Sequence, residues 1–298
     1  MSTGRIGVAV VTYNSADVVG ALLDSLPAAL DGVAASVVVV DNGSTDATAA
    51  VLEARTDCRL VRSANVGFGA GLNLAWRHLD DVDALLVLNP DLTLEPRAVR
   101  VLLDRLHADP RTGIVVPQLR DGTGALARSL RREPSLLNAA GLKFLPDPRF
   151  SETVTEPDRY AHEGTVDWAT GAAMLISARC FTELDGFDES FFLYSEETDL
   201  CLRARDAGWA TVYTPDAVAT HLGAGSGFDI RLHGLQLQNR VRLYRKRHSA
   251  PQTLCYHGLV VLAELSWIVR GKSESSQALT MLFDLRRPPA ALLVGDHG

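Results

Sequence analysis

The sequence predicts an α/β fold with a mostly parallel, Rossmann-like sheet flanked by helices and followed by C-terminal helices. The first observation is a set of short, fully apolar segments at residues 6–11, 37–40 and 84–88, of which the first two are rich in β-branched residues. The second is that helical patterns with one apolar face alternate with these segments. Apolar strands alternating with helices are typical of a parallel sheet that is buried on both faces.

The N-terminal half follows this alternation element by element. The expected strands are residues 6–11, 37–40, 60–61 and 84–88, and the helices between them begin near Val18, after Asp46 and after Gly71. Polar clusters follow three of the strands, at residues 12–14, 41–46 and 89–91. Each cluster alone has an ordinary turn composition. Because ligands bind at the carboxyl ends of parallel strands, three such clusters favour a composite ligand site.

The second half is less regular. The expected strands are residues 112–116 and 211–213, with a loop or short hairpin at 120–132, a helix at 231–246, and apolar helices at 259–268 and 277–285. Residues 134–160 carry four prolines, which predicts a mobile connection. The helices after Pro251 would pack on the domain, form an oligomer contact such as a homodimer, or face a membrane.

Composition limits the class of protein. The 298 residues are 47% apolar and 22% charged, which suits one large core or two unequal units. A net charge of −7 gives no indication of nucleic-acid binding. The four cysteines are far apart, which argues against a cysteine metal site and is typical of a reduced cytoplasmic protein.

We recognise no signal peptide at the N-terminus. The longest apolar run, residues 258–269, is shorter than the roughly 20 apolar residues that span a bilayer. We therefore expect a cytoplasmic protein, with peripheral attachment at the inner face of the membrane left open.

A glycine run and an acid mark the possible phosphate side of the ligand site. Residues 67–71, Gly-Phe-Gly-Ala-Gly, match a dinucleotide fingerprint only weakly, because they follow the third strand with a different spacing. A tight turn leading into a helix near a phosphate is the alternative. Asp91, just past a buried strand, indicates a divalent cation that bridges the protein and a phosphate.

Three acids cluster in the segment 186–200, namely Glu196, Glu197 and Asp199. A helix that begins near Ser195 and ends at Gly208 would place them in its first turn, where the helix dipole favours ionised carboxylates. An ionised carboxylate at the lip of a cleft can act as a general base. A solvated, well-capped helix start is the alternative interpretation.

Together these segments resemble a family 2 glycosyltransferase of the GT-A type. The matching pieces are residues 11–14, 40–46, 65–73, 88–91 and the acidic segment, and their order and spacing agree over roughly residues 5–247. Within the family, the sequence is most similar to the rhamnosyltransferase-like branch. The resemblance implies a catalytic domain at residues 1–250, with a nucleotide-binding half at 1–117 and an acceptor half at 118–250, and a helical extension at 251–298.

The resemblance also implies the donor site. The residues that would bind the nucleotide-diphospho sugar are Thr12, Tyr13, Asn14, Asp41, Asn65, Gly69, Asn73, Asn89 and Asp91, with Asp41 addressing the base. Asn89-Pro90-Asp91 stands in place of the family's DxD motif, so Asp91 is its sole acidic ligand for Mg²⁺ or Mn²⁺. His221 stands where the family places a metal-ligating histidine, and a structural histidine is the alternative.

The acceptor side follows from the same resemblance. Glu197 aligns with the catalytic base, which is more often Asp in the family, while Glu196 and Asp199 would orient the acceptor or the base. Thr170 and Gly171 would approach the donor sugar, and Trp168 would either stack on a sugar or belong to the core.

Three further segments could contact substrate. Arg128, Arg131 and Arg132 could meet an acceptor phosphate or form a solvated run. The loop 223–227 would close over the diphosphate. The basic cluster at 240–248 would bind phosphate or an anionic membrane surface, or form a solvated helix end.

The resulting hypothesis is an enzyme that transfers a sugar with inversion to an acceptor hydroxyl, on a cell-envelope or lipid-linked glycan or on a small natural product. A nucleotide-sugar-binding module without turnover is one alternative. A sugar nucleotidyltransferase is the other, although such enzymes usually carry a glycine-rich basic loop after the first strand, where this chain has Thr12-Tyr13-Asn14-Ser15.

Overall fold

The computed structural model describes residues 4–142, 145, 147–223, 230–271 and 274–283. Within these residues one large sheet has the order β3-β2-β1-β4-β11-β6-β12-β5, with β7 paired to β6 and β9 paired to β12. Its strands are β1 (Ile6–Thr12), β2 (Ala35–Asp41), β3 (Arg59–Arg62), β4 (Ala84–Leu88), β5 (Leu92–Leu94), β6 (Thr112–Asp121), β7 (Leu126–Ala127), β9 (Gly164–Thr165), β11 (Ala173–Ser177) and β12 (Ala210–His221). A separate pair joins β8 (Leu130–Arg131) to β10 (Trp168–Ala169).

The sheet is mostly parallel, as the sequence predicts. β1 runs parallel to β2 and β4, β2 to β3, and β6 to β12. β11 interrupts this pattern because it lies antiparallel between β4 and β6. The register pairs Thr12 with Asp41, so two of the predicted polar clusters begin at the same edge of the sheet.

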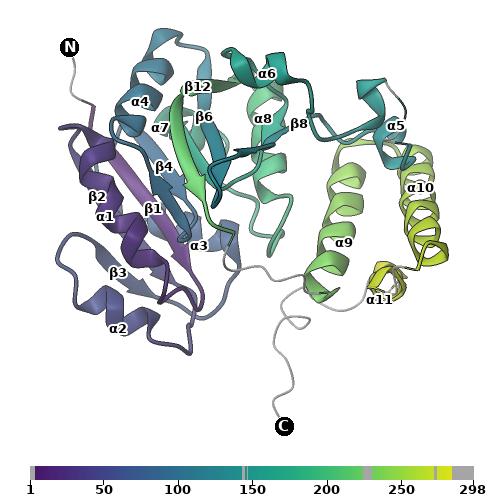
Figure 1. Cartoon of the computed structure of the whole chain (residues 1–298), viewed down its shortest axis with the longest axis horizontal. Coiled ribbons are helices and arrows are strands. Elements are labelled where there is room, and N and C mark those ends of the chain that lie inside the picture. Colours follow the sequence, from purple (N-terminus) through teal and green to yellow (C-terminus); the bar gives the residue numbers. More distant parts are fainter. Residues whose placement is uncertain (1–3, 143–144, 146, 224–229, 272–273, 284–298) are drawn as a thin grey trace.

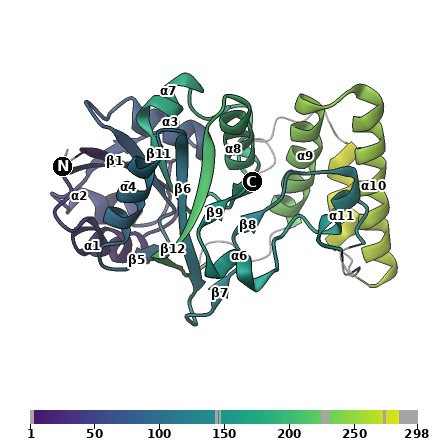
Figure 2. The same ribbon diagram turned by 90° about the horizontal axis from the view of Figure 1, so that it is seen from above.

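Helices cover both faces of the sheet (Figures 1 and 2). They are α1 (Val19–Leu30), α2 (Thr48–Glu53), α3 (Phe68–Trp76), α4 (Ala98–Ala108), α7 (Ala178–Glu183) and α8 (Glu196–Asp206). Val8 and Val10 of β1 share a core with α1 and α4, whereas Ala9 and Val11 share a second core with α3, α7 and α8. Burial of both strand faces accounts for the uninterrupted apolar runs.

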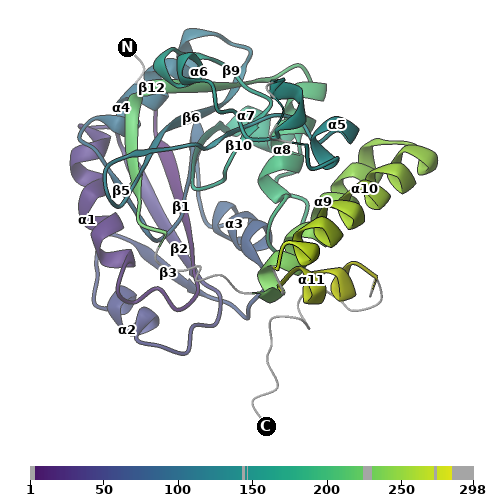
Figure 3. The ribbon, with the colours of Figure 1, turned by 45° about the vertical axis from the view of Figure 1, so that its right-hand side comes forward.

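A third core joins the C-terminal helices beside the sheet (Figure 3). It contains residues of α5 (Leu136–Ala139), α9 (Ile230–Arg247), α10 (Ala250–Val269) and α11 (Glu274–Phe283). The ring of Tyr244 stacks on Tyr256 with centroids 4.0 Å apart and on His248 with centroids 3.8 Å apart. The helices after residue 250 are thus packed on α9, which is one of the arrangements expected for the C-terminal segment.

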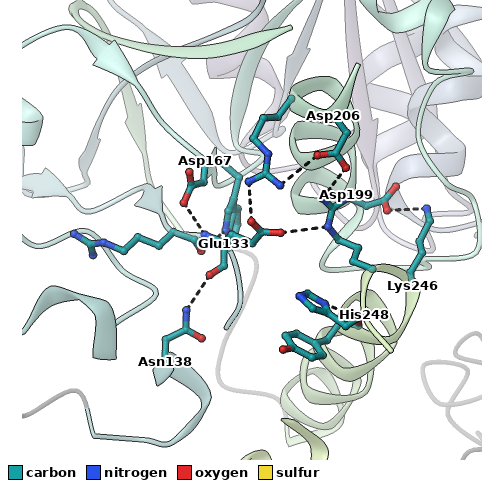
Figure 4. Close-up of polar contacts among 12 residues, drawn as sticks. Glu133, Asn138, Asp167, Asp199, Asp206, Lys246 and His248 are labelled. Carbon is teal, nitrogen blue, oxygen red and sulfur yellow. Dashed lines mark hydrogen bonds and ion pairs between the residues drawn. The ribbon is translucent and has the colours of Figure 1, made fainter. Parts of the chain in front are cut away.

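Ion pairs join α9 to α8 and to the segment around Glu133 (Figure 4). Glu133 accepts from Arg205 of α8 at 2.7 Å and from Arg247 of α9 at 3.3 Å. Arg247 also pairs with Asp206 at 2.7 Å, and Lys246 pairs with Asp199 at 2.7 Å. Much of the basic cluster that the sequence offered for phosphate or membrane binding is therefore neutralised by acids of the same chain.

Several elements differ in length from the sequence-based expectation. β12 is a single strand of 12 residues rather than a short strand at 211–213, and its register shifts between Thr214 and Val218. Pro215 falls in that irregularity, where a residue without a backbone N–H is tolerated. Residues 120–132 contain the β6–β7 hairpin, as expected.

The connection 134–160 is more ordered than predicted. Its described residues include α5, a 3₁₀ turn η1 (Pro148–Phe150) and α6 (Pro157–Ala161). The proposed closing loop at 223–227 falls, apart from Gly223, outside the described residues.

The apolar C-terminal helix is also longer than predicted. α10 has 20 residues, enough by length and composition to cross a membrane, with 22% of its most apolar window buried inside the protein. Tyr256, Val260 and Glu264 form its buried side.

The glycine run joins α3 to the acidic segment. Gly67 has φ of 95°, and a Cβ there would lie 2.3 Å from the carbonyl oxygen of Phe192. The Phe68 N–H donates to the same oxygen at 2.8 Å. Asn73 on α3 adds a two-way amide contact with the backbone of Phe187, at 2.8 and 2.9 Å. Two segments more than 100 residues apart in sequence are thereby locked together.

Gly67→Ala is expected to lower the free energy of unfolding by about 2–4 kcal/mol, because the added methyl group meets backbone and the required φ is strained for any other residue. Denaturation in urea measures this loss. Gly20→Ala is the matched control, since Gly20 lies within α1 with no atom within 4 Å of its added Cβ. That variant should be as stable as the wild type or up to about 1 kcal/mol more stable. Equal stability of the two variants would contradict this account of the close approach.

Candidate functional site

The carboxyl ends of β1 and β2 carry a cluster of polar side chains around one buried carboxylate. Asp41 is 4% exposed and accepts from Thr12 Oγ1 at 3.1 Å and from Ser44 N–H at 3.3 Å. The Ser44 hydroxyl also donates to Asp41. These contacts fix the orientation of the carboxylate at the edge of the sheet.

The same cluster includes Asn14, which has φ of 51° and whose side-chain oxygen accepts from Thr45 N–H at 2.8 Å. Tyr13 beside it is 52% exposed, so one face of an aromatic ring is available at this edge. Asn65 lies nearby, because a Cβ on Gly43 would be 3.6 Å from its backbone nitrogen. The structure thus brings Thr12, Tyr13, Asn14, Asp41 and Asn65 together, as the sequence predicted.

Two residues assigned to the donor site have a different environment. Asn73 is 8% exposed and its amide is engaged with the backbone of Phe187, so it holds the acidic segment in place instead of lining the nucleotide pocket. Gly69 is buried against Phe187 and Glu196, with a hypothetical Cβ 3.1 Å from one and 3.4 Å from the other. Both residues act in packing because α3 carries the acidic segment, which the sequence did not reveal.

Asp91 and His221 meet where β5 pairs with β12. This pairing sets His221 Nε2 3.1 Å from Asp91 Oδ1. The Asp91 side chain is 11% exposed and that of His221 30% exposed. Asn89 precedes them and donates its N–H to the carbonyl of Ala172 at 2.8 Å.

These two side chains suit a divalent cation that is shared with a substrate. Among the residues that the structure describes, no group of three or more His, Cys, Asp or Glu side chains is gathered for a metal. Mg²⁺ is commonly held by one or two carboxylates, with the remaining positions filled by substrate phosphates and water. An oxygen and an imidazole nitrogen at one edge fit that pattern, with open positions left for a diphosphate.

The acidic helix begins as predicted, but its first residue lacks the expected cap. Tyr194 and Ser195 both have positive φ, 69° and 75°, and the Ser195 side chain makes no capping hydrogen bond with any described residue. Asn239 of α9 instead donates to the carbonyls of Leu193 and Tyr194, at 2.8 and 3.2 Å. Strained backbone that is held by its surroundings is common at functional sites.

Glu196 and Glu197 are not the solvated, ionised pair that the helix start suggested. Glu196 is 3% exposed, and Glu197 is partly exposed. Burial raises the pKa of Glu196 well above its ordinary value, and the neighbouring charge of Glu197 raises it further. Burial also raises the pKa of Glu197, while backbone N–H groups and Arg131 oppose the shift. Desolvation therefore raises the pKa of both carboxyl groups by more than the helix N-terminus lowers it.

Two glycines make this burial feasible. A Cβ on Gly69 would lie 3.4 Å from Glu196, and one on Gly171 would lie 3.2 Å from Glu197. Because neither glycine has a side chain, the carboxylates approach the backbone on either side. One oxygen of each carboxylate is buried without a hydrogen-bond partner in the described part of the chain. Of the two, Glu197 is the more accessible to a substrate.

Asp199, the third acid, is fully buried and ion-paired. It accepts from Arg203 Nε at 2.6 Å and from Lys246 Nζ at 2.7 Å (Figure 4). Arg203 in turn donates to the carbonyls of Leu184 and Gly186. Asp199 therefore anchors α8 to α9 and to the acidic segment, and both of its oxygens are engaged away from a substrate.

On the acceptor side, Trp168 is 8% exposed and its Nε1–H donates to the carbonyl of Arg132 at 2.8 Å. Its packing supports the core alternative rather than stacking on a sugar. Thr170 and Gly171 are partly exposed, and Gly171 contacts Glu197. Sequence reasoning missed Asn239 and Arg203, although the Asp199–Arg203 spacing of four residues in a helix was a usable signal for the latter.

Comparison with known proteins identifies the family. The pattern described as "Glycosyltransferase like family 2" matches residues 4–242. The chain is 30% identical over 303 residues to the N-acetylglucosaminyl-diphospho-decaprenol L-rhamnosyltransferase of Mycobacterium tuberculosis H37Rv, covering 96% of this chain and 95% of the relative. It is 25% identical over 219 residues to rhamnosyltransferase WbbL of Escherichia coli K12, covering 71% of this chain and 81% of that protein.

Solved structures resemble the fold at lower identity. The mannosyltransferase PcManGT of Pyrobaculum calidifontis, in complex with GDP-Man and Mn²⁺, has a TM-score of 0.57 and 18% identity over 97% of this chain and 82% of its own. S. aureus TarS 1-349, in complex with UDP-GlcNAc, has a TM-score of 0.55 and 16% identity over 93% of this chain and 79% of its own. At these identities the similarity concerns the fold alone.

Glu196→Gln is expected to stabilise the protein increasingly as the pH rises. Because the pKa of Glu196 is raised on folding, the folded chain keeps a proton that the unfolded chain releases above its ordinary pKa of 4.5. The contribution of this group to stability is therefore complete below that pH and is lost as the pH rises toward the folded-state pKa. Urea denaturation from about pH 5 to pH 8 should show a growing advantage of the variant over the wild type.

Asp147→Asn provides the control. Arg149 lowers the pKa of Asp147 to about 2, so this carboxylate is charged throughout the same pH range in both folded and unfolded chains. The effect of Asp147→Asn should therefore be flat. A flat profile for Glu196→Gln as well would show that Glu196 is solvated.

Proposed function

The chain belongs to glycosyltransferase family 2, and on that premise we propose that it transfers a rhamnosyl or other hexosyl group from a nucleotide-diphospho sugar to a lipid-linked glycan of the cell envelope. It has the GT-A fold that the resemblance implied. The mycobacterial relative is a rhamnosyltransferase for N-acetylglucosaminyl-diphospho-decaprenol, and this similarity favours a lipid-linked acceptor over a small natural product.

One observation carries the proposal: the segment that contains Asp91 and the side chain of Glu197 contact adjacent residues of one stretch of backbone, Ala172 and Gly171. Asn89, two residues before Asp91, is hydrogen-bonded to Ala172, and the adjacent Gly171 packs on Glu197. A sugar bound over residues 171–172 would have its diphosphate toward Asp91 and its opposite face toward Glu197. In-line displacement at an anomeric carbon requires this separation of the leaving group from the base.

The donor half supports nucleotide binding. The fixed Asp41 carboxylate offers a hydrogen-bond acceptor for the N–H groups of a base, and the exposed Tyr13 ring offers a stacking surface. Asp91 and His221 would hold Mg²⁺ or Mn²⁺. The bound cation would neutralise charge on the diphosphate as it leaves.

Glu197 acts as the general base in this proposal. It accepts the proton of the acceptor hydroxyl, and the hydroxyl oxygen forms a bond to the anomeric carbon. The bond from that carbon to the diphosphate oxygen breaks, and its electron pair leaves with the nucleoside diphosphate. Because the enzyme contributes no nucleophile, the single displacement inverts the anomeric centre. Burial that raises the pKa of Glu197 makes its carboxylate a stronger base.

A peripheral membrane contact belongs to the same proposal. α10 exposes an apolar face that includes Leu254, Leu262 and Val269, which are 74%, 62% and 88% exposed. Near its end Arg270 lies over the ring of Trp267 at 5.2 Å, a pairing suited to a membrane interface. This face would rest at the cytoplasmic surface of the membrane that contains the acceptor lipid. A second copy of the chain, in a homodimer, is the other occupant that the face would accept.

Glu197→Gln is expected to lower kcat by roughly 10²–10⁴-fold while nucleotide binding stays within about twofold, because only the proton acceptor is removed. Release of nucleoside diphosphate in the presence of acceptor gives kcat, and calorimetry with the nucleotide gives affinity. Glu196→Gln, the neighbouring isosteric change, is the control and should retain more activity. Near-wild-type turnover by Glu197→Gln would contradict the assignment, and loss confined to Glu196→Gln would move the base to Glu196.

Chelation with EDTA is expected to abolish transfer, and Mn²⁺ or Mg²⁺ to restore it. Asp91→Ala and His221→Ala should each raise the Mn²⁺ concentration for half-maximal activity by about tenfold or more, since even outer-shell partners of a metal are worth that much. His107→Ala removes an exposed histidine of α4 and should leave the Mn²⁺ requirement unchanged. Full activity of the chelated wild type would contradict the metal site.

A further inference from the structure

One arginine on the acceptor side, Arg131, is partly buried and yet differs from the ion-paired arginines around it. Arg132 pairs with Glu156, Arg240 with Glu152, and Arg247 with Glu133 and Asp206. Arg131 has no such partner: across the described ranges no carboxylate lies within ion-pair distance of it. Its Nη1 donates to the carbonyls of Arg128 and Leu130, at 2.6 and 3.0 Å. Its Nε and Nη2 make no hydrogen bond with any described residue.

Arg131 lies beside the proposed base. It pairs with Trp168 across β8 and β10, and its guanidinium is 5.9 Å from the centre of the Trp168 ring. Three residues beyond Trp168, Gly171 packs on Glu197. Arg131 and Glu197 are near enough for their charges to interact, since Arg131 opposes the rise in the pKa of Glu197. The cation and the base therefore flank the same end of β10.

The chemistry of this arginine is that of an anion-binding group. Burial lowers the pKa of the Arg131 guanidinium, and partial desolvation of an unpaired charge is unfavourable unless a ligand compensates it. Its guanidinium lies over the Trp168 ring and is the group best suited to bidentate contact with phosphate. Arg128 adds an exposed second cation, and its carbonyl is held by Arg131 itself.

We propose that Arg131, assisted by Arg128, binds the diphosphate of the acceptor, on the side of Glu197 away from the donor diphosphate. The acceptor sugar would then lie between the two residues, with its anomeric phosphate on Arg131 and its reacting hydroxyl on Glu197. This site selects acceptors that carry an anionic diphosphate on the sugar to be extended. The inference rests on the proposed function, because it identifies the acceptor class of the same site.

The kinetic test uses the full chain and two acceptors with the same sugar. One is N-acetylglucosamine linked through diphosphate to a short prenyl chain, and the other is a neutral alkyl glycoside of N-acetylglucosamine. Arg131→Met should raise KM for the diphosphate acceptor by about 10- to 100-fold, the range expected for lost charged hydrogen bonds. Its KM for the donor should stay within about twofold of the wild type. Its kcat/KM should fall about tenfold or more further for the diphosphate acceptor than for the neutral glycoside, whose smaller loss reports the removal of positive charge beside Glu197. Arg131→Lys keeps the positive charge but loses the bidentate guanidinium. Its KM for the diphosphate acceptor should therefore lie between those of the wild type and Arg131→Met.

Arg149→Met is the matched control, because Arg149 is an exposed arginine of the same half that pairs with Asp147. It should leave both acceptors unaffected. An equal loss on both acceptors with Arg131→Met would show that Arg131 acts only through Glu197 or through folding, and would overturn the proposal. Unchanged KM for both acceptors would overturn it as well.

A binding measurement separates this inference from the proposed function. Calorimetry with a short prenyl diphosphate is done in EDTA and without donor. Under these conditions no metal is bound at Asp91 and His221, so binding of the probe through that site does not contribute. The wild type and Arg149→Met should bind this probe, and Arg131→Met should bind it about tenfold or more weakly. If the wild type transfers sugar to neither acceptor, the proposed function fails while this titration still decides the role of Arg131. Equal binding by the three proteins would refute the anion site.

Discussion

The close approach of Gly67 to Phe192 is the contact on which the rest of the site depends. It is reinforced by the amide of Asn73 on the backbone of Phe187, so α3 carries the acidic segment. Through this junction the start of α8 is fixed relative to the edge where Asp41 and Asp91 lie. A site assembled from distant parts of the chain needs such a rigid join, because small displacements of catalytic groups are costly. The glycine run thus serves packing between segments.

Electrostatics then divides the three acids of α8 between two roles. Glu196 and Glu197 lie against Gly69 and Gly171, where burial raises the pKa of both carboxyl groups. Asp199, one turn away, is paired with Arg203 and Lys246 and joins α8 to α9. Arg131 approaches the pair from β8 and supplies the nearby positive charge that helps Glu197 to ionise. Acids that are close in sequence therefore have opposite environments: within the described chain Glu196 and Glu197 have buried carboxylate oxygens without a cationic partner in ion-pair contact, whereas Asp199 is ion-paired and joins two helices.

The sequence was sufficient for the parallel strands, since their apolar runs report burial on both faces, and for the grouping of Thr12 with Asp41. It was insufficient for β11 and for the length of β12, because strand direction and the bulge around Pro215 depend on pairing partners. The burial of Glu196 could not be predicted from the sequence either. A run of acids after Ser195 has the composition of a solvated helix start, and its burial arises from glycines more than 20 residues away in the chain. The isolation of Arg131 depends likewise on which neighbouring arginines find carboxylates.

A crystal structure with an unhydrolysed nucleotide-diphospho sugar and Mn²⁺ would test the central claim most directly, namely that Glu197 and the Asp91–His221 pair face opposite sides of one anomeric carbon. The account predicts Mn²⁺ bound to Asp91 and His221, the diphosphate on that metal, and the anomeric carbon over residues 171–172 with its free face toward Glu197. A sugar whose free face turns away from Glu197, or a metal bound elsewhere, would contradict it.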